Sequence, residues 1–222
     1  MQTIELFSGS GHISKALQDN GFKTFTVDFR KRKGVCEPDL QTDIKSLKYL
    51  VLLNNIQKKY NKLDEILLVW ASVPCTCWSI AANGKHFNGK IAKTEEGLES
   101  IQLLKKTISL IRLIKPKYYF IENPRGELRY NKTMIDFLID SKGLTRQTFW
   151  GDYGFPTPKP TNIFTNCYDL KLRADCKYGR GAICDFKFNN LTQNQRQSIP
   201  VLFADDFAKQ IKFYQSEQLT II

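Results

Sequence analysis

The sequence lacks the features that mark membrane, secreted and zinc-stabilised proteins. No apolar run approaches the about 20 residues needed to cross a bilayer, so we expect no membrane association. The six cysteines show neither zinc-ribbon spacing nor the density of a disulfide framework, and no signal peptide precedes the first residues. The one Cys-x-Cys pair, Cys75 and Cys77, has no second pair nearby. We therefore expect a cytoplasmic protein with reduced thiols and no metal.

The chain also lacks internal repeats and low-complexity linkers. Its 222 residues, 42% of them hydrophobic, suffice for one sizeable core. We expect three parts: a core at residues 1–166, a polar insert without clear periodicity at 167–195, and a C-terminal segment at 196–222 whose helix packs back on the core.

Acidic residues are in short supply. The chain has 33 Lys and Arg against 22 Asp and Glu, which gives a net charge of +11 and a pI near 9.3. Such a surplus on a small surface attracts phosphodiester backbones and favours nucleic acid as the partner. It also fits a lysine-rich surface that serves only solubility, and charge alone does not separate the two interpretations.

Apolar periodicity predicts strands that alternate with helices along most of the chain. Strands are expected at residues 3–7, 23–28, 66–70, 118–121, 146–150 and 162–166, and helices at 13–20, 46–57, 95–114, 133–141 and 199–213. Residues 81–93 have little periodicity and suggest a mobile basic loop. The alternation predicts an α/β fold of the Rossmann-like kind, with a mostly parallel sheet and helices on both faces.

The most informative motif is Pro74-Cys75, which follows the apolar run 66–70. Open α/β sheets place their chemistry at the carboxyl ends of strands, so Cys75 is well placed to act as a nucleophile. Glu122 follows the next predicted strand and would lie beside it. Cys75 could instead be an inert buried thiol, and Cys77 is a rival nucleophile two residues further on.

A second motif, Phe7-Ser8-Gly9-Ser10-Gly11, follows the first predicted strand and precedes a helix. A Gly-x-Gly turn in this place lets backbone amides approach a cofactor, although the same pattern is often only a tight turn. Asp28, at the end of the second strand, could accept hydrogen bonds from ribose hydroxyls. The third glycine of the dinucleotide pattern is missing, so a nucleoside cofactor such as S-adenosylmethionine fits better than NAD.

Taken in order, these motifs closely resemble the motif series of the DNA cytosine-5 methyltransferases, and in particular their compact, phage-type branch. The resemblance covers nearly the whole chain and rests on 7–11, Asp28, Asp43, Pro74-Cys75, Glu122-Asn123-Pro124 and the segment 153–162. It implies that the protein methylates carbon 5 of cytosine in DNA, working in the cytoplasm of a bacterial cell or a phage-infected host. No obligate protein partner is evident.

The resemblance also implies a role for each motif. Cys75 would add to carbon 6 of a flipped-out cytosine, Glu122 would bond its N3 and N4 edge, and Lys159 would hold its carbonyl or phosphate. S-adenosylmethionine would be held by Phe7, Ser8, Gly9, Ser10, Gly11, Asp28, Phe29, Asp43, Ile44 and Pro74, with Phe7 and the Asp43-Ile44 pair at the adenine. From the residues alone, Phe7 could equally be core, Asp43 a helix N-cap, and Glu122 a helix cap or the partner of Arg125.

The chain departs from the family pattern in three places. Lys159 stands in a Thr-Pro-Lys-Pro-Thr segment where the family has a Gln-x-Arg-x-Arg segment, and Trp78 stands where phenylalanine is usual. The insert is short, which predicts brief or relaxed sequence specificity. Residues expected to contact nucleic acid are Ser79, Lys85, Arg125, Lys159, Thr161, Arg173 and Arg180. The cations of the insert could also be only a solvated face.

Two other functions fit the same sequence. Some members of this family act on transfer RNA with the same catalytic series, so RNA is an alternative substrate. A protein that kept the fold but lost catalysis would bind nucleic acid without methylating it. The segment 196–211 resembles the final family motif, a helix that completes the cofactor pocket.

Overall fold

A computed structural model describes residues 1–30, 37–88, 91–173 and 191–219. Its centre is a seven-stranded sheet in the order β3-β2-β1-β4-β7-β9-β8. The strands are β1 (Gln2–Leu6), β2 (Lys23–Asp28), β3 (Leu40–Gln41), β4 (Ile66–Ser72), β7 (Tyr118–Pro124), β8 (Leu144–Phe149) and β9 (Pro160–Thr165). The first five in the sheet run parallel, and β9 runs antiparallel to both β7 and β8.

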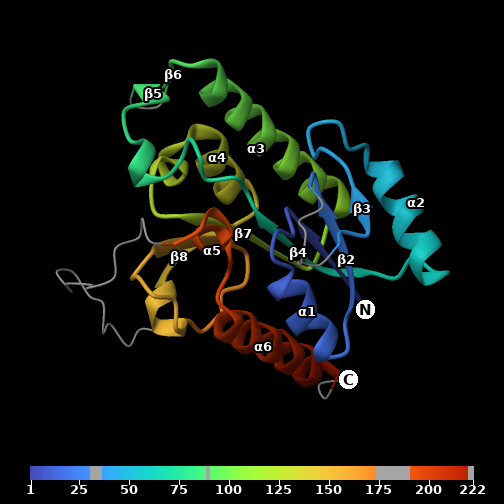
Figure 1. Cartoon of the computed structure of the whole chain (residues 1–222). Helices are drawn as coiled ribbons and strands as arrows, with labels where there is room; N and C mark the ends of the chain where they lie inside the picture. Colours follow the sequence, from blue (N-terminus) through green and yellow to red (C-terminus); the bar gives the residue numbers. More distant parts are fainter. Residues whose placement is uncertain (31–36, 89–90, 174–190, 220–222) are drawn as a thin grey trace.

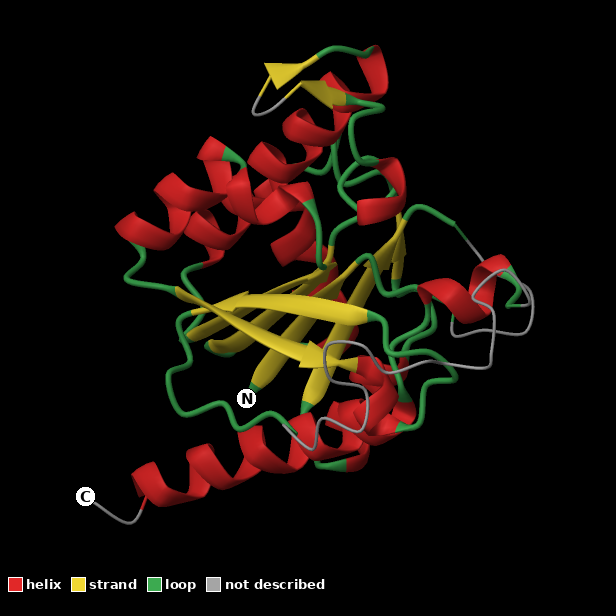
Figure 2. Ribbon diagram, turned by 90° about the vertical axis from the view of Figure 1, so that its left-hand side faces the viewer, coloured by secondary structure: helices red, strands yellow, loops and turns green. Residues whose placement is uncertain are grey.

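Helices cover both faces of this sheet, as Figures 1 and 2 show. They are α1 (His12–Asp19), α2 (Tyr49–Tyr60), α3 (Glu95–Ile114), α4 (Lys132–Asp140), α5 (Gln193–Gln197) and α6 (Val201–Leu219), with 3-10 turns η1 (Ile80–Ala82), η2 (Glu127–Tyr130) and η3 (Trp150–Tyr153). One apolar cluster joins the sheet to α2, α3 and α4, and a second joins it to α1, α6 and η3. The predicted Rossmann-like α/β fold is confirmed.

Helix boundaries follow local chemistry. Thr94 caps α3 by accepting a hydrogen bond from the Gly97 N–H, and two glutamates in the first turn favour the positive end of the helix dipole. Helix α1 begins differently, because its N-cap is Gly11 and has no side chain to offer. The carboxylate of Glu5 on β1 accepts from the Ser14 N–H at 2.9 Å and satisfies a first-turn donor instead.

The sequence-based elements agree with the structure in most places. The strand at 23–28 and the helix at 95–114 have the predicted limits, whereas α2 starts three residues later than expected because residues 44–46 form a turn. In that turn the Lys45 N–H donates to the Asp43 carboxylate at 2.8 Å. Asp43 therefore caps a turn, in keeping with the alternative of a local capping role.

The segment 81–93, expected to be a mobile basic loop, contains regular elements. This segment contains η1 and a small hairpin of β5 (Phe87–Asn88) and β6 (Ile91–Ala92), which Figure 1 shows beside the start of α3. Phe87 is buried, and its ring stacks on Trp78 with centroids 4.7 Å apart. This stacking contact anchors the hairpin, and the periodicity of apolar residues in the segment gives no sign of it.

The predicted insert at 167–195 is only partly described. Cys167, Leu170 and Leu191 are buried in the second apolar cluster, so both described ends of the segment pack on the core. Helix α5 begins at Gln193, inside the predicted insert. Residues 174–190 lie outside the described part, and the three-part division remains a prediction. Among the described helices, none combines the length and the apolar character that a membrane span requires.

Helix α6 is held by aromatic packing against the centre of the sheet. The ring of Phe207 is 5.0 Å from that of Trp70 and 4.8 Å from that of Phe120. We expect Phe207→Ala to lower the free energy of unfolding by about 3–5 kcal/mol, because it leaves a cavity in a close-packed cluster. Phe213→Ala, on the same helix but with the ring 55% exposed, is the matched control and should cost less than about 1 kcal/mol. Urea unfolding measures both, and equal losses would contradict the assignment of the core.

Candidate active site

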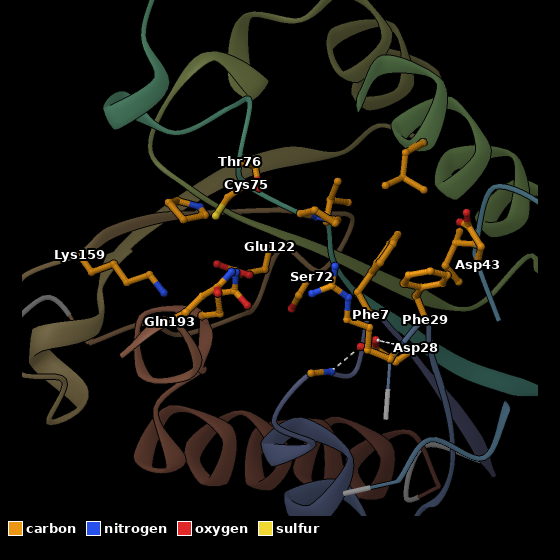
Figure 3. A pocket seen from close by; sticks show the side chains of 18 residues that line it. Phe7, Asp28, Phe29, Asp43, Ser72, Cys75, Thr76, Glu122, Lys159 and Gln193 are labelled. Atoms are coloured by element: carbon orange, nitrogen blue, oxygen red, sulfur yellow. Dashed lines mark hydrogen bonds between the residues drawn. The ribbon is translucent and has the colours of Figure 1, made fainter. Parts of the chain in front are cut away.

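A cavity of about 360 Å³ opens at the carboxyl ends of β1, β2, β4 and β7. This is the switch point of the sheet, since the chain moves outward from β1 in one direction and from β4 in the other. The lining consists of Phe7, Gly9, Asp28, Phe29, Arg30, Asp43, Ile44, Ser72, Val73, Pro74, Cys75, Thr76, Leu103, Glu122, Pro124, Lys159, Gln193 and Gln197. Figure 3 shows Cys75, Glu122 and Lys159 toward one end and Phe7, Phe29, Asp28 and Asp43 toward the other.

The turn after β1 is held in an unusual backbone conformation. Phe7, Gly9 and Gly11 all have positive φ, of 59°, 50° and 70°. Glycine adopts this region without strain, but a phenylalanine rarely does, and such strain persists mainly where a site depends on it. The side chain of Phe7 lines the cavity and also packs against the first apolar cluster, so its alternative role in the core is present and its role as a ligand remains a prediction.

Asp28 fixes the opposite side of this turn. One carboxylate oxygen accepts from the Gly9 N–H at 2.8 Å, and the other accepts from the Arg30 N–H at 2.9 Å. Each oxygen keeps a second lone pair, so the carboxylate can still accept hydroxyl hydrogen bonds from a sugar. Phe29 lies beside it with 59% of its surface exposed, which offers an aromatic face to a ring bound in the cavity.

The loop after β4 presents Cys75 through several backbone ties. The N–H groups of Trp78 and Ser79 both donate to the Cys75 carbonyl oxygen at 3.0 Å. The buried amide of Asn123 donates to the Val73 carbonyl at 2.8 Å and joins this loop to β7. Gly126 passes so close that an added Cβ would meet the Trp78 carbonyl oxygen at 1.9 Å. The segment Glu122–Gly126 thus supplies both a carboxyl group and the scaffold for the cysteine.

Glu122 and Lys159 complete the end of the cavity that contains the thiol. Glu122 on β7 is 7% exposed and pairs in register with Ser72 of β4. Lys159 has a φ of 33°, and its ammonium donates to the Arg196 carbonyl at 2.6 Å and lies 5.2 Å from the Phe155 ring centroid. The hydrogen bond fixes Lys159 against α5, which closes this side of the cavity.

The three groups shift one another's ionisation. Burial raises the pKa of Cys75, the Glu122 carboxylate raises it further, and the Lys159 ammonium opposes both. Burial also raises the pKa of Glu122, against Lys159 and a hydrogen bond from Ser72. Burial lowers the pKa of Lys159. All three shifts favour the neutral forms, as expected for charges taken out of water.

The other predicted cofactor residues differ in their positions. Ile44 and Pro74 line the cavity. Ser8, Ser10 and Gly11 lie in the turn but are not among the lining residues. The Ser8 N–H donates to the Val27 carbonyl, and the Gly11 N–H donates to the Ser8 carbonyl. These residues therefore shape the turn that carries Phe7 and Gly9.

The residues predicted to contact nucleic acid differ in how far the structure exposes them. Lys85 is exposed, and Ser79 and Arg125 are half-buried close to the Cys75 loop. Thr161 does not fit the prediction, whereas Arg173 is exposed but paired within the chain. Thr161 is fully buried and its hydroxyl donates to the Lys159 carbonyl. Arg173 forms an ion pair with Asp206 at 2.7 Å.

A buried hydroxyl already bonded to a carbonyl is not presented to a phosphate, so the prediction for Thr161 was wrong. The Arg173 side chain is 39% exposed beside its partner, and its contact with nucleic acid remains a prediction. Arg173 also lies over the Tyr153 ring at 5.0 Å. The last predicted contact, Arg180, lies outside the described residues.

Several lining residues were missed by the sequence analysis. Gln193 and Gln197 stand four residues apart on α5, so both reach the cavity from one face of that short helix. The C-terminal wall is thus made by α5, whereas the final helix, α6, packs on α1 behind the sheet. Ser72 was missed as well, although its place three residues before Cys75 was a usable signal. Nothing in the sequence pattern pointed to α5.

Comparisons with known proteins agree with this geometry. A family model for C-5 cytosine-specific DNA methylases matches residues 1–137, more than half of the 222 residues. A protein of Frog virus 3 (isolate Goorha), named "Probable DNA (cytosine-5)-methyltransferase", is 30% identical over 129 residues, covering 56% of this chain and 54% of that protein.

Two solved structures share the fold. A prophage-encoded E. coli protein described as a DNA modification methyltransferase matches with a TM-score of 0.52 and 17% identity, over 74% of this chain and 46% of that one. A methyltransferase of Entamoeba histolytica matches with a TM-score of 0.52 and 16% identity, over 78% and 55%. The chain spans about half the length of these relatives.

The electrostatic coupling around Cys75 gives a direct prediction. Replacing Glu122 by Gln removes the negative charge that helps to raise the pKa of Cys75, so that pKa should fall. The pH midpoint of Cys75 alkylation by iodoacetamide should move to lower pH, and Lys159→Met should move it to higher pH. Peptide mass spectrometry separates Cys75 from Cys77. Glu99→Gln, on the exposed side of α3, is the control and should leave the midpoint unchanged. If neither pocket substitution shifts the pH midpoint of Cys75 alkylation, the three groups do not face one another.

The buried Glu5 carboxyl gives a second prediction. Burial raises its pKa from 4.5 to about 8, although hydrogen bonds from Ser14 oppose the shift. Between these values the folded chain keeps a proton that the unfolded chain has lost, so Glu5 makes stability fall as pH rises. Glu5→Gln keeps an acceptor oxygen for Ser14 without the titration. Its stability relative to the native chain should therefore increase from pH 5 to pH 8, as measured by urea unfolding. A difference that is constant or decreases over this range contradicts the assignment.

Proposed function

Because the chain belongs to the family of C-5 cytosine-specific DNA methylases, we propose that it transfers a methyl group from S-adenosylmethionine to carbon 5 of cytosine in DNA. One observation carries the proposal. The thiol of Cys75, the carboxyl of Glu122 and the ammonium of Lys159 line the same cavity as the Gly-x-Gly turn and Asp28. This transfer needs a nucleophile, a group that holds the base and a cradle for a nucleoside cofactor in one cavity.

Cys75 acts as the nucleophile in this proposal. Carbon 5 of cytosine is a weak nucleophile, and a thiolate that adds to carbon 6 turns it into part of an enamine. The bond from Sγ to carbon 6 forms while the electron pair of the ring double bond moves to carbon 5. Once carbon 5 carries the methyl group, a base takes the proton from carbon 5, its bonding pair restores the ring double bond, and the bond from Sγ to carbon 6 breaks to return the thiolate. Lys159 assists by favouring the thiolate form of Cys75.

Glu122 holds the base during this addition. Burial raises its pKa and so favours a protonated carboxyl, which can donate to N3 while its other oxygen accepts from the N4 amino group. Both hydrogen bonds strengthen as the ring is attacked, which lowers the barrier. The Lys159 ammonium can donate to the cytosine carbonyl or to a phosphate of the target.

The other end of the cavity fits a nucleoside cofactor without a pyrophosphate. Asp28 offers carboxylate oxygens for ribose hydroxyls, and the Phe7 and Phe29 rings with Ile44 offer an apolar setting for adenine. S-adenosylmethionine supplies an electrophilic methyl group on a sulfonium when bound. Asp28, Phe7 and Phe29 would orient it toward the end of the cavity that contains the thiol.

The DNA substrate has to deliver its cytosine unstacked. Carbon 6 is inaccessible inside a duplex, so the base would be flipped into the cavity. The net charge of +11 supports binding to the phosphate backbone. The short segment between β9 and α5 supports brief or relaxed sequence specificity, because it offers few side chains for reading bases.

The nucleophile is tested by exchanging single sulfur atoms. We expect Cys75→Ser to abolish methylation of cytosine-containing duplex DNA and to leave S-adenosylmethionine binding, measured by calorimetry, near that of the native chain. Cys77→Ser is the matched control. Its thiol is buried and lies 3.5 Å from the Glu96 carbonyl, away from the lining of the cavity, so methylation should persist.

A trapping experiment separates the alternatives. DNA that contains 5-fluorocytosine should form a covalent complex with the native chain and with Cys77→Ser, but not with Cys75→Ser, on a denaturing gel. Salt-sensitive binding with no adduct in the native chain would indicate a catalytically inactive binding protein. Turnover on structured RNA with none on DNA would replace the proposed substrate.

A further inference from the structure

A hydrogen bond joins a core tryptophan to a serine that is the strand neighbour of Glu122. The indole N–H of Trp70 donates to the hydroxyl oxygen of Ser72 at 2.9 Å. Ser72 lies opposite Glu122 in the register of β4 and β7. Both residues line the cavity, and Figure 3 shows Ser72 between Glu122 and Phe7.

The chemistry of the two side chains decides which of them donates. An indole N–H can only donate, and a hydroxyl carries one proton with two acceptor positions. Since the Ser72 oxygen accepts from Trp70, its own proton is left for another partner, and the neighbouring side chain across the strand pair is that of Glu122. Trp70 thereby sets the direction in which the Ser72 hydroxyl donates.

Trp70 is itself held by the core. It is fully buried, and its ring packs at 5.9 Å from Phe120 and at 5.8 and 5.0 Å from Phe203 and Phe207 of α6. A side chain packed on several sides keeps one rotamer. The packing of Trp70 against α6, behind the cavity, therefore fixes the direction of the Ser72 hydroxyl.

We propose that Ser72 is a positioning residue for Glu122, with its hydroxyl aimed by Trp70 so that the carboxyl group keeps one orientation in the cavity. Neither residue touches the reacting atoms in this account. The inference rests on the proposed function only for what Glu122 then does to the base, because the alignment of the carboxyl is a property of the chain itself.

The charged groups that face Glu122 are few. Cys75 approaches from the loop after β4, and Lys159 approaches from the turn before β9. The Lys159 ammonium and the Ser72 hydrogen bond both lower the pKa of Glu122, against the effect of burial. Removing the Ser72 hydroxyl should therefore raise the pKa of Glu122 while leaving Lys159 in place.

The kinetic test uses a matched pair of variants. Ser72→Ala should lower kcat about 10- to 100-fold, the range expected for one hydrogen bond to a charged group, with KM for both substrates changed less than about threefold. The limb of the pH profile in which Glu122 loses its proton should move to higher pH. Ser72→Thr restores a hydroxyl on a strand that tolerates threonine, and it should recover most of kcat and the native pH profile. Equal losses in Ala and Thr, or a native kcat in Ala, would overturn the proposal.

The role of Trp70 is tested independently. Trp70→Phe keeps an aromatic ring in the cluster but removes the indole N–H, so kcat should fall less than in Ser72→Ala. In the double variant, Trp70→Phe should lower kcat no further than Ser72→Ala alone, because both substitutions interrupt the same path from Trp70 through Ser72 to Glu122. Additive losses in the double variant would show that Trp70 acts only through packing, and would overturn its part in the proposal.

A measurement without turnover separates this inference from the proposed function. Carbon-13 NMR of protein labelled at glutamate Cδ, with Glu122→Gln to assign the signal, follows the titration of Glu122 directly. Its midpoint should lie at higher pH in Ser72→Ala than in the native chain or in Ser72→Thr. That shift in a chain without methylation activity would uphold the positioning role and reject the proposed function. An unshifted midpoint in an active enzyme would do the reverse.

Discussion

The burial of the Glu122 carboxyl beside the Cys75 thiol and the Lys159 ammonium is the interaction on which the site depends. An isolated buried carboxylate costs several kcal/mol, and here the ammonium and the Ser72 hydroxyl offset part of that cost. The remainder appears as shifted ionisation, with the pKa of the thiol and of the carboxyl raised and that of the ammonium lowered. Such a site suits a polar ring that exchanges hydrogen bonds with these three groups, as solvent would do at a surface.

The sheet explains how Cys75 and Glu122, which are 47 positions apart in the sequence, come to share this cavity. Strands β4 and β7 are parallel neighbours, so their carboxyl ends meet at one edge, and β1 and β2 bring the glycine turn and Asp28 to the same edge. Asn123 and Gly126 then tie the Cys75 loop to the end of β7. Behind the sheet, the aromatic cluster of α6 fixes Trp70, and the hydrogen bond from Trp70 to Ser72 links this cluster to the lining of the cavity.

Much of the fold and of the candidate site could be predicted from the sequence, because each depends on local patterns. Proline before Cys75, the acid near the end of β7 and the glycines after β1 each follow an apolar run, and parallel topology brings strand ends together. Contacts between distant segments could not be predicted. The pairing of Arg173 with Asp206 joins residues 33 positions apart, and the bond from Lys159 to the Arg196 carbonyl joins residues 37 positions apart. For the same reason the wall formed by α5 was missed, and Thr161 was misjudged as a surface contact.

The central claim is that one cavity holds a cytosine between Cys75 and Glu122. A crystal structure of the complex trapped on DNA containing 5-fluorocytosine tests it most directly. The account predicts continuous density from the Cys75 sulfur to carbon 6 of an unstacked cytosine, with the Glu122 carboxyl at its N3 and N4 edge and Lys159 at the opposite side. A base bound elsewhere, a bond to another cysteine, or a Glu122 side chain turned away from the ring would contradict it.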